Sequence, residues 1–206
     1  MIQNWGDFKY YLRADLASCG VKPSPYHFIV NPCHRYTLLL RLHEYAHNTN
    51  SIIRIPVKIW RRLLEIKLGY VIHLNVFGPG LCLLHYGSIM VTKNAVVGKN
   101  CRLHICTHIT ETGELGVEGP EYSPRIGDNC YIGPGSKIYG PITIGDNCVI
   151  AANAVVTKSF PEPGLTLGGI PAKVIATGGT GDKVVHGADM IPLPKGRTEI
   201  PRQLTK

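Results

Sequence analysis

The chain has 206 residues, of which 44% are hydrophobic and 17% charged, so its composition is that of a globular protein and not of a disordered one. No stretch of 18 apolar residues occurs and the first residues lack the pattern of a signal peptide, so neither a membrane-spanning helix nor a secretion signal is expected. The formal net charge of +8 is concentrated in residues 1–70, which hold ten Lys/Arg and four Asp/Glu, but no nucleic-acid-binding motif accompanies it and no nucleic-acid partner is expected.

Residues 1–68 are predicted to form an α-helical cap, because they lack the periodicity of the residues that follow. Helical segments are expected near 4–18, 34–47 and 54–68. The prolines of PSPY (23–26) should separate the first segment from the second, since proline lacks the N–H that a helix interior requires.

The last of these segments, RIPVKIWRRLLEIKL, is amphipathic and basic. Its apolar residues share one side: Ile55, Ile59, Leu63 and Ile66. The basic residues Lys58, Arg61 and Arg62 lie elsewhere around the helix. We interpret the segment as a helix that covers the open end of the next domain. Docking on a membrane surface is the alternative, because it also requires an apolar face bordered by basic residues.

From Val91 onward an aliphatic residue recurs every six positions. These positions are Val91, Val97, Leu103 and Ile109, and, after an interruption, Ile126, Ile132, Ile138, Ile144, Ile150 and Val156. A period of six fits a short strand followed by a corner, and three such faces close a coil of 18 residues. The pentapeptide IGDNC accordingly returns after 18 residues, one coil further on. Residues 69–176 are therefore predicted to form a mainly β coil.

Asparagine and cysteine mark the predicted corners. Asn100, Asn129 and Asn147 occupy positions where a tight left-handed turn is needed, which asparagine tolerates. Each is followed by a cysteine that we expect to be buried: Cys101, Cys130 and Cys148. The seven cysteines include no CxxC pair, which favours a reducing compartment and a cytoplasmic protein.

Two segments depart from the period. The step from Ile109 to Ile126 is 17 residues instead of six, so a polar, Gly-rich loop is expected at 110–125, where an excursion from a rigid scaffold often binds ligands. Residues 177–206 are rich in Gly and Pro without a period and are predicted to form an extended or mobile tail.

The repeat, the loop and the closing LGGIPAKVI (167–175) together resemble the left-handed parallel β-helix acyltransferases, over about residues 69–175. The stretch LCLLHYGSIMVTKNAVVGKNC and the helical N-terminal third are most similar to the serine O-acetyltransferases and their relatives in polysaccharide biosynthesis. The resemblance implies acetyl-CoA as donor, a hydroxyl as acceptor, and a homotrimer with active sites between subunits. Whether two trimers pair is left open.

His85 is the candidate general base, since acyl transfer to an alcohol needs a group that titrates near neutral pH. Counting back six from Val91 leads to His85, a polar residue where the pattern expects an aliphatic one. The resemblance supports this assignment, because His85 aligns with the catalytic histidine of the family.

His104 and His108 lie about one coil after His85, and we assign His104 to the acceptor side of the same cleft. Corner or surface positions are the simpler interpretation of both. A zinc site of three histidines, as in the gamma-class carbonic anhydrases that share this fold, is not expected, because residues 104 and 108 fall at different points of successive hexads.

Three acceptor-side positions differ from serine acetyltransferases or match them loosely. The acidic residue that orients the base is absent from GYVIHLNVF, where His73 and Asn75 are the polar candidates. Ser123 stands where relatives have a second histidine that contacts the amino-acid substrate. Asp15 is the expected counterpart of an acidic residue in the helical cap near the acceptor.

The resemblance also implies where coenzyme A binds. Small residues should let its pantetheine arm lie against the coil: Gly133, Gly135, Ala151 and Ala152. Lys158 and Lys173 match the phosphate-facing positions of the family.

Three functions therefore remain open: an O-acetyltransferase acting on serine, one acting on a sugar of a surface polysaccharide, and a non-catalytic or metal-binding β-helix module. Serine acetyltransferases dock a sulfhydrylase through a C-terminal isoleucine. This chain ends in Leu204, Thr205 and Lys206, so no such complex is expected.

Overall fold

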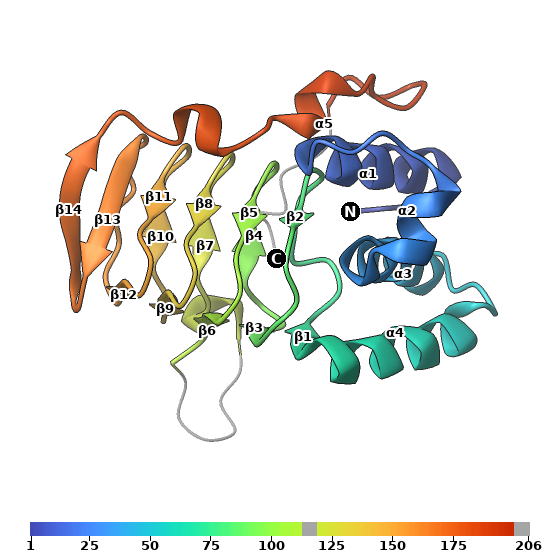
Figure 1. Ribbon diagram of the computed structural model, residues 1–206, viewed down its shortest axis with the longest axis horizontal. Helices are drawn as coiled ribbons and strands as arrows, with labels where there is room; N and C mark the ends of the chain where they lie inside the picture. Colours follow the sequence, from blue (N-terminus) through green and yellow to red (C-terminus); the bar gives the residue numbers. More distant parts are fainter. Residues whose placement is uncertain (113–118, 200–206) are drawn as a thin grey trace.

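The computed structural model describes residues 1–112 and 119–199. Figure 1 shows the N-terminal helices at one end, a stack of short strands at the other, and a C-terminal segment that runs back over the strands to the first helix. Residues 113–118 of the predicted loop, and the C-terminal Leu204, Thr205 and Lys206, lie outside the described residues.

The helical end consists of α1 (Trp5–Ser18), α2 (Pro25–Val30), α3 (Pro32–Asn48) and α4 (Arg54–Leu68). Asn4, Ser24 and Asn31 cap the first three by accepting hydrogen bonds from backbone N–H groups of the first turn. Helix α2 is not anticipated by the sequence interpretation, which treats PSPY as a separator. Pro25 instead occupies the first position of this helix, where its missing N–H costs nothing.

The strands form three sheets that make up the faces of a triangular coil. The first sheet contains β1 (Tyr70–Ile72), β3 (Ile89–Val91), β6 (Thr107–Thr110), β9 (Lys137–Tyr139) and β12 (Val155–Val156). The second contains β4 (Val96–Val97), β7 (Arg125–Ile126) and β10 (Thr143–Ile144). The third contains β2 (Cys82–Leu83), β5 (Arg102–Leu103), β8 (Tyr131–Ile132), β11 (Val149–Ile150), β13 (Leu165–Gly169) and β14 (Ala172–Thr177). Pairing is parallel except between β13 and β14, which close the coil as an antiparallel hairpin.

The six-residue period is confirmed by burial. Its aliphatic positions are at most 2% exposed, from Val91 through Ile138 to Val156, and they form one continuous core. Asn100, Asn129 and Asn147 have φ between 56° and 58°, as predicted, and the cysteines after them are buried. The three asparagines also form a ladder, because Asn100 donates to Asn129 (2.9 Å) and Asn129 to Asn147 (3.0 Å).

A buried charge network joins the helices to the first coil. Arg41 on α3 is fully buried and pairs with Asp15 at 2.7 Å and Glu44 at 2.9 Å. It also donates to the carbonyl oxygens of Phe77 (3.1 Å) and Gly78 (2.8 Å). Burial lowers the pKa of Arg41, but the two carboxylates raise it more, so this guanidinium stays charged. The network therefore holds α1, α3 and the start of the coil together.

Helix α4 is oriented opposite to the sequence interpretation. Val57, Leu64 and Leu68 face α3 and the coil, whereas the predicted covering residues Ile55, Ile59, Leu63 and Ile66 are exposed. The prediction was wrong because the helix carries two apolar sides. The shorter one, which also includes the buried Glu65, is the one that packs.

The C-terminal segment, predicted to be extended or mobile, packs against the molecule over its described residues 177–199. It contains a 3₁₀ turn (Gly181–Lys183) and α5 (Gly187–Met190), which contacts α1. The hydroxyl of Tyr10 donates to the carbonyl of Ala188 (2.9 Å), and Arg197 pairs with the buried Asp7. Partners on α1 thus hold a segment whose own sequence has no helical or strand pattern.

Candidate active site

His85 lies in an enlarged corner between the third and first sheets. Leu83 pairs with Leu103 and Ile89 with Thr107, so this corner holds two more residues than the same corner of the next coil. Leu83 therefore occupies the inward position, and the count of six from Val91 that led to His85 was wrong. His85 is exposed on the outside of the coil. Its main chain is fixed because the hydroxyl of Tyr70 donates to its carbonyl oxygen (2.8 Å).

His104 occupies the same corner one coil further on. Its ring packs against Tyr131 with 4.9 Å between centroids, and its backbone N–H donates to the carbonyl of Ile132 (3.1 Å). Burial lowers the pKa of His104, and the nearby Arg102 and His85 lower it further. Its Nε2 is buried and has no hydrogen-bond partner among the described residues. The corner thus places a neutral imidazole with an unused ring nitrogen beside His85.

The predicted small residues continue this corner along the coil. Gly133, Gly135, Ala151 and Ala152 follow β8 and β11 as His104 follows β5. A Cβ on Gly133 would lie 2.7 Å from the carbonyl oxygen of Ile150, and Gly135 has a φ of 75°, so coil stacking alone already requires glycine at both positions. The exposed Ala152 offers a low surface beside them.

Three comparisons show which known proteins this chain is similar to. A family model described as bacterial transferase hexapeptide (six repeats) matches residues 123–158. The serine acetyltransferase of Mycobacterium tuberculosis is 35% identical over 123 residues, which are 59% of this chain and 52% of that protein. The crystal structure of serine acetyltransferase from Brucella abortus has a TM-score of 0.66 and 25% identity, covering 84% of this chain and 70% of the other.

The chain resembles the hexapeptide-repeat acyltransferases. It shares the left-handed parallel β-helix of these structures, including that of soybean serine acetyltransferase (TM-score 0.67, 25% identity, 82% of this chain and 69% of the other). The serine acetyltransferase of Synechococcus elongatus is 28% identical over 154 residues, which are 73% of this chain and 60% of that protein. This chain thus spans about half the length of the Mycobacterium tuberculosis relative and 60% of the Synechococcus elongatus one.

Against this acyltransferase background, Asp15 is not placed to bind an acceptor. Its carboxylate is 1% exposed and accepts hydrogen bonds from Arg41 and from the backbone N–H groups of Gly80 and Leu81 (both 2.8 Å). The sequence assignment was wrong because it treated the acidic residue of the cap as a ligand-binding group. In this chain it neutralises a buried arginine.

Ser123 and Lys158 lie at a different corner, between the first and second sheets. Ser123 is buried at the base of the predicted loop and donates to Glu111 (2.8 Å). Lys158 is exposed between β12 and Phe160, with its Nζ 5.6 Å from the Phe160 ring centre. Lys173, by contrast, lies on β14 opposite Gly168, whose Cβ position would be 3.5 Å from Ala151. Of the two predicted phosphate-facing lysines, Lys173 is therefore the one that lies near the small residues of its own chain.

Glu111 was not assigned a role from the sequence. Besides Ser123, its carboxylate accepts from Thr92 (3.0 Å) and Asn94 (3.5 Å). Burial raises the pKa of Glu111, but these hydrogen bonds outweigh it and lower the pKa. The sequence could not predict these hydrogen bonds of Glu111. Its partners Thr92 and Asn94 belong to another coil, and Ser123 lies beyond the loop.

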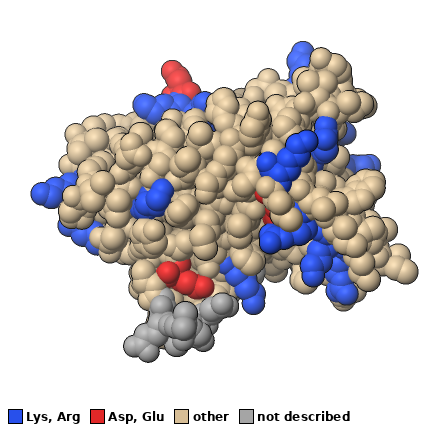
Figure 2. All heavy atoms as spheres, turned by 60° about the horizontal axis from the view of Figure 1, so that its bottom comes forward, with Lys and Arg blue, Asp and Glu red and all other residues tan. Residues whose placement is uncertain are grey.

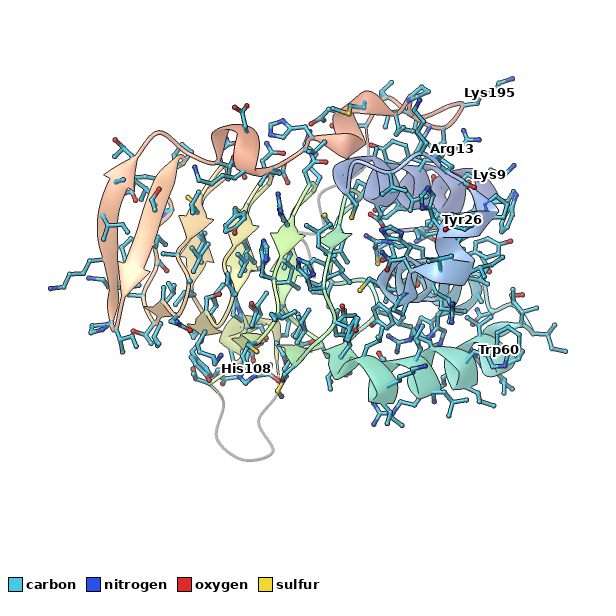
Figure 3. All side chains as sticks on the ribbon, viewed as in Figure 1. Lys9, Arg13, Tyr26, Trp60, His108 and Lys195 are labelled. Atoms are coloured by element: carbon cyan, nitrogen blue, oxygen red, sulfur yellow. The ribbon has the colours of Figure 1, made fainter. Side chains whose placement is uncertain are left out.

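The three histidines considered as metal ligands do not share one corner of the coil. His108 lies on β6 of the first sheet, in register with Met90 and Lys137, and not in the corner of residues 104–106 that holds His104 (Figure 3). In residues 1–112 and 119–199, no group of three or more His, Cys, Asp or Glu is arranged to hold a metal. A groove of about 890 Å³ runs along the second sheet beneath the C-terminal segment, and neither His85 nor His104 lines it.

Proposed function

We propose that the chain is an acetyl-CoA-dependent O-acetyltransferase with His85 as general base. The observation that carries this proposal is the corner itself, where an exposed histidine lies beside a half-buried neutral one at the head of a surface of small residues. The resemblance to serine acetyltransferases gives the reaction class. A structure of the Brucella abortus enzyme in complex with coenzyme A supports the donor.

In the proposed reaction, the oxygen of the acceptor hydroxyl attacks the thioester carbonyl carbon while His85 accepts the hydroxyl proton. Backbone N–H groups near the corner stabilise the tetrahedral oxyanion. The carbon–sulfur bond then breaks, and His85 returns the proton to the leaving thiolate. His104, in the same corner one coil further on, is the proposed neighbour of the acceptor, although its Nε2 is buried within the single chain.

The position of Lys158 favours an active site shared between copies of the chain. His85 and the small residues lie at one corner, while Ser123 and Lys158 lie at another. A trimer in which the second corner of one copy faces the first corner of its neighbour would bring all these residues to one donor and acceptor. We therefore propose a homotrimer.

Serine is the first candidate acceptor, because the relatives named above are serine acetyltransferases. A sugar hydroxyl is the second. It is favoured by the engagement of Asp15 with Arg41 and by the presence of Ser123 instead of histidine, since both remove groups that would recognise an amino acid.

The deciding experiment measures coenzyme A release from acetyl-CoA by the purified chain, with L-serine beside a panel of sugars and sugar nucleotides. His85→Ala should lower turnover by about 10²- to 10⁴-fold. His47→Ala, a matched change at an exposed histidine of α3, should leave turnover unchanged.

Serine turnover that depends on His85 would establish a serine acetyltransferase. Turnover limited to a sugar would indicate that Ser123 and the buried, paired Asp15 reflect an acceptor other than serine. Equal turnover by His85→Ala and the unmodified chain would refute the assignment of the base. The absence of turnover with every acceptor would contradict the proposed activity on the compounds tested.

A further inference from the structure

Helix α4 presents an apolar stripe to the outside of the molecule. Five of its side chains, and one just before it, are between 54% and 88% exposed: Ile52, Ile55, Ile59, Trp60, Leu63 and Ile66. Except for Trp60, which borders the stripe, they follow one another at intervals of three or four residues, so they share one side of the helix. Isolated exposed aliphatic residues are common, but a continuous stripe is not.

The stripe has no counterpart in the packing of α4 onto the rest of the chain. The opposite side holds Val57, Leu64 and Leu68 against α3 and the coil. Arg61, on that inner side, donates to the carbonyl of Ile72 (2.7 Å) and pairs with Glu65 (2.8 Å). The helix is therefore firmly held from within while its outer stripe faces solvent.

Basic residues border the stripe. Lys58, Arg62 and Lys67 are exposed beside it, whereas Glu65, the acidic residue of α4, is only 4% exposed and pairs with Arg61 (2.8 Å) and more distantly with Arg62 (3.6 Å). Figure 2 shows basic side chains gathered over the helical end, with most of the visible acidic ones lying elsewhere. Trp60 lies on α4 at the far end of the molecule from β14 (Figure 3).

We propose that α4 docks on the surface of a bilayer that contains anionic lipids. An apolar stripe bordered by Lys and Arg is what a helix needs to lie in the interface, with aliphatic and Trp side chains among the acyl chains and basic ones at the headgroups. Among the described residues no helix is long and apolar enough to cross a bilayer.

A second copy of the chain fits the same stripe less well. Two α4 helices packed face to face would bring Lys58, Arg62 and Lys67 of one copy close to those of the other. No exposed acidic residue of α4 would balance them, because Glu65 is buried and paired. A negatively charged lipid surface supplies that balance.

The test is co-sedimentation of the full chain with vesicles of phosphatidylcholine alone and with vesicles that also contain phosphatidylglycerol. Lys58→Glu/Arg62→Glu is compared with Lys9→Glu/Arg13→Glu, an equally spaced exposed pair on α1, which is separated from α4 by α3 (Figures 1 and 3). A third variant, Leu63→Asp, removes apolar contact, and the molar mass of every variant is measured in solution.

We expect binding to the anionic vesicles only, weakened by added salt. The α4 charge reversal should weaken it by an order of magnitude or more, and Leu63→Asp should weaken it too, with no effect of the α1 reversal. Equal loss in both reversals, or no binding to anionic vesicles, would overturn the proposal. It would also be overturned if Leu63→Asp lowered the molar mass but left vesicle binding intact, because the stripe would then bind a second copy.

Discussion

The coil and the helical cap are stabilised in different ways. In the coil the same contacts return every 18 residues: a buried aliphatic residue on each face, a ladder of backbone hydrogen bonds, and an asparagine at one corner. In the cap the contacts are made once, by the charge network around Arg41 and a small aromatic cluster with Phe8, Tyr10 and Tyr11. Loss of one contact should therefore harm the cap more than the coil, because only the coil has equivalent neighbours.

The largest expected effect follows from removal of Arg41. Arg41→Ala leaves Asp15 and Glu44 buried and unpaired, and it should lower the free energy of unfolding by about 3 to 5 kcal/mol. Denaturant unfolding with a probe of helix content measures this loss. Arg13→Ala, at an exposed position of the neighbouring helix, should change the stability by less than about 0.5 kcal/mol. Similar losses in the two variants would contradict the central role of the network.

A pH effect of intermediate size is expected from His43 on α3. Burial, and then the positive charge of Arg61, lowers its pKa from 6.5 to about 4. On acidification, His43 is protonated near pH 6.5 in the unfolded chain but only near pH 4 in the folded chain. The free energy of unfolding should therefore fall as the pH falls from about 6.5 to about 4, by at most about 3 kcal/mol.

The variant His43→Leu should flatten that part of the stability profile, measured by denaturant unfolding between pH 7 and pH 4. His47→Leu, at an exposed site on the same helix, should change it much less, because the charge of His47 contributes to the lowered pKa of His43 only after burial and Arg61. An unchanged slope in His43→Leu would show that other histidines cause the pH dependence.

The smallest expected effect is in the coil. Asn129→Ala places a side chain that disfavours the left-handed conformation at a φ of 57° and breaks the asparagine ladder, at a cost of about 1 to 2 kcal/mol. Asn129→Gly breaks the same ladder without the strain, so its loss should be smaller. If the two variants unfold at the same denaturant concentration, the backbone conformation is not the source of the effect.

This difference between the regions also decides what could be predicted from the sequence. The coil was predictable because each inward residue, such as Ile132 or Ile138, repeats the environment of the one before it. The partners of Arg41 could not be predicted, since Asp15 and Phe77 lie far from it in the sequence and on other elements. The buried side of α4 could not be chosen either, because both of its sides are apolar.

The structure brings together some of the residues assigned to the candidate site and separates others. His85 and His104 share a corner, but the reasoning from the period that led to His85 failed, because two additional residues enlarge that corner. Asp15 was assigned by its position in the cap, and only its partners reveal that it is closed to ligands. The sequence also did not indicate that Lys158 and Lys173 lie at different places on the coil, because both were assigned only by their match to phosphate-facing positions.

The enlarged corner has a consequence for how such a scaffold can change. Leu83 and Val91 are eight residues apart and Ile109 and Ile126 are 17 apart, instead of six. All four side chains are nevertheless buried in the core of the coil. In a flat sheet, insertion of an odd number of residues within a strand turns every later side chain to the wrong face. At a corner of the coil, segments of any length can be gained or lost without that penalty. New chemistry can therefore evolve at the corners while the faces keep their order.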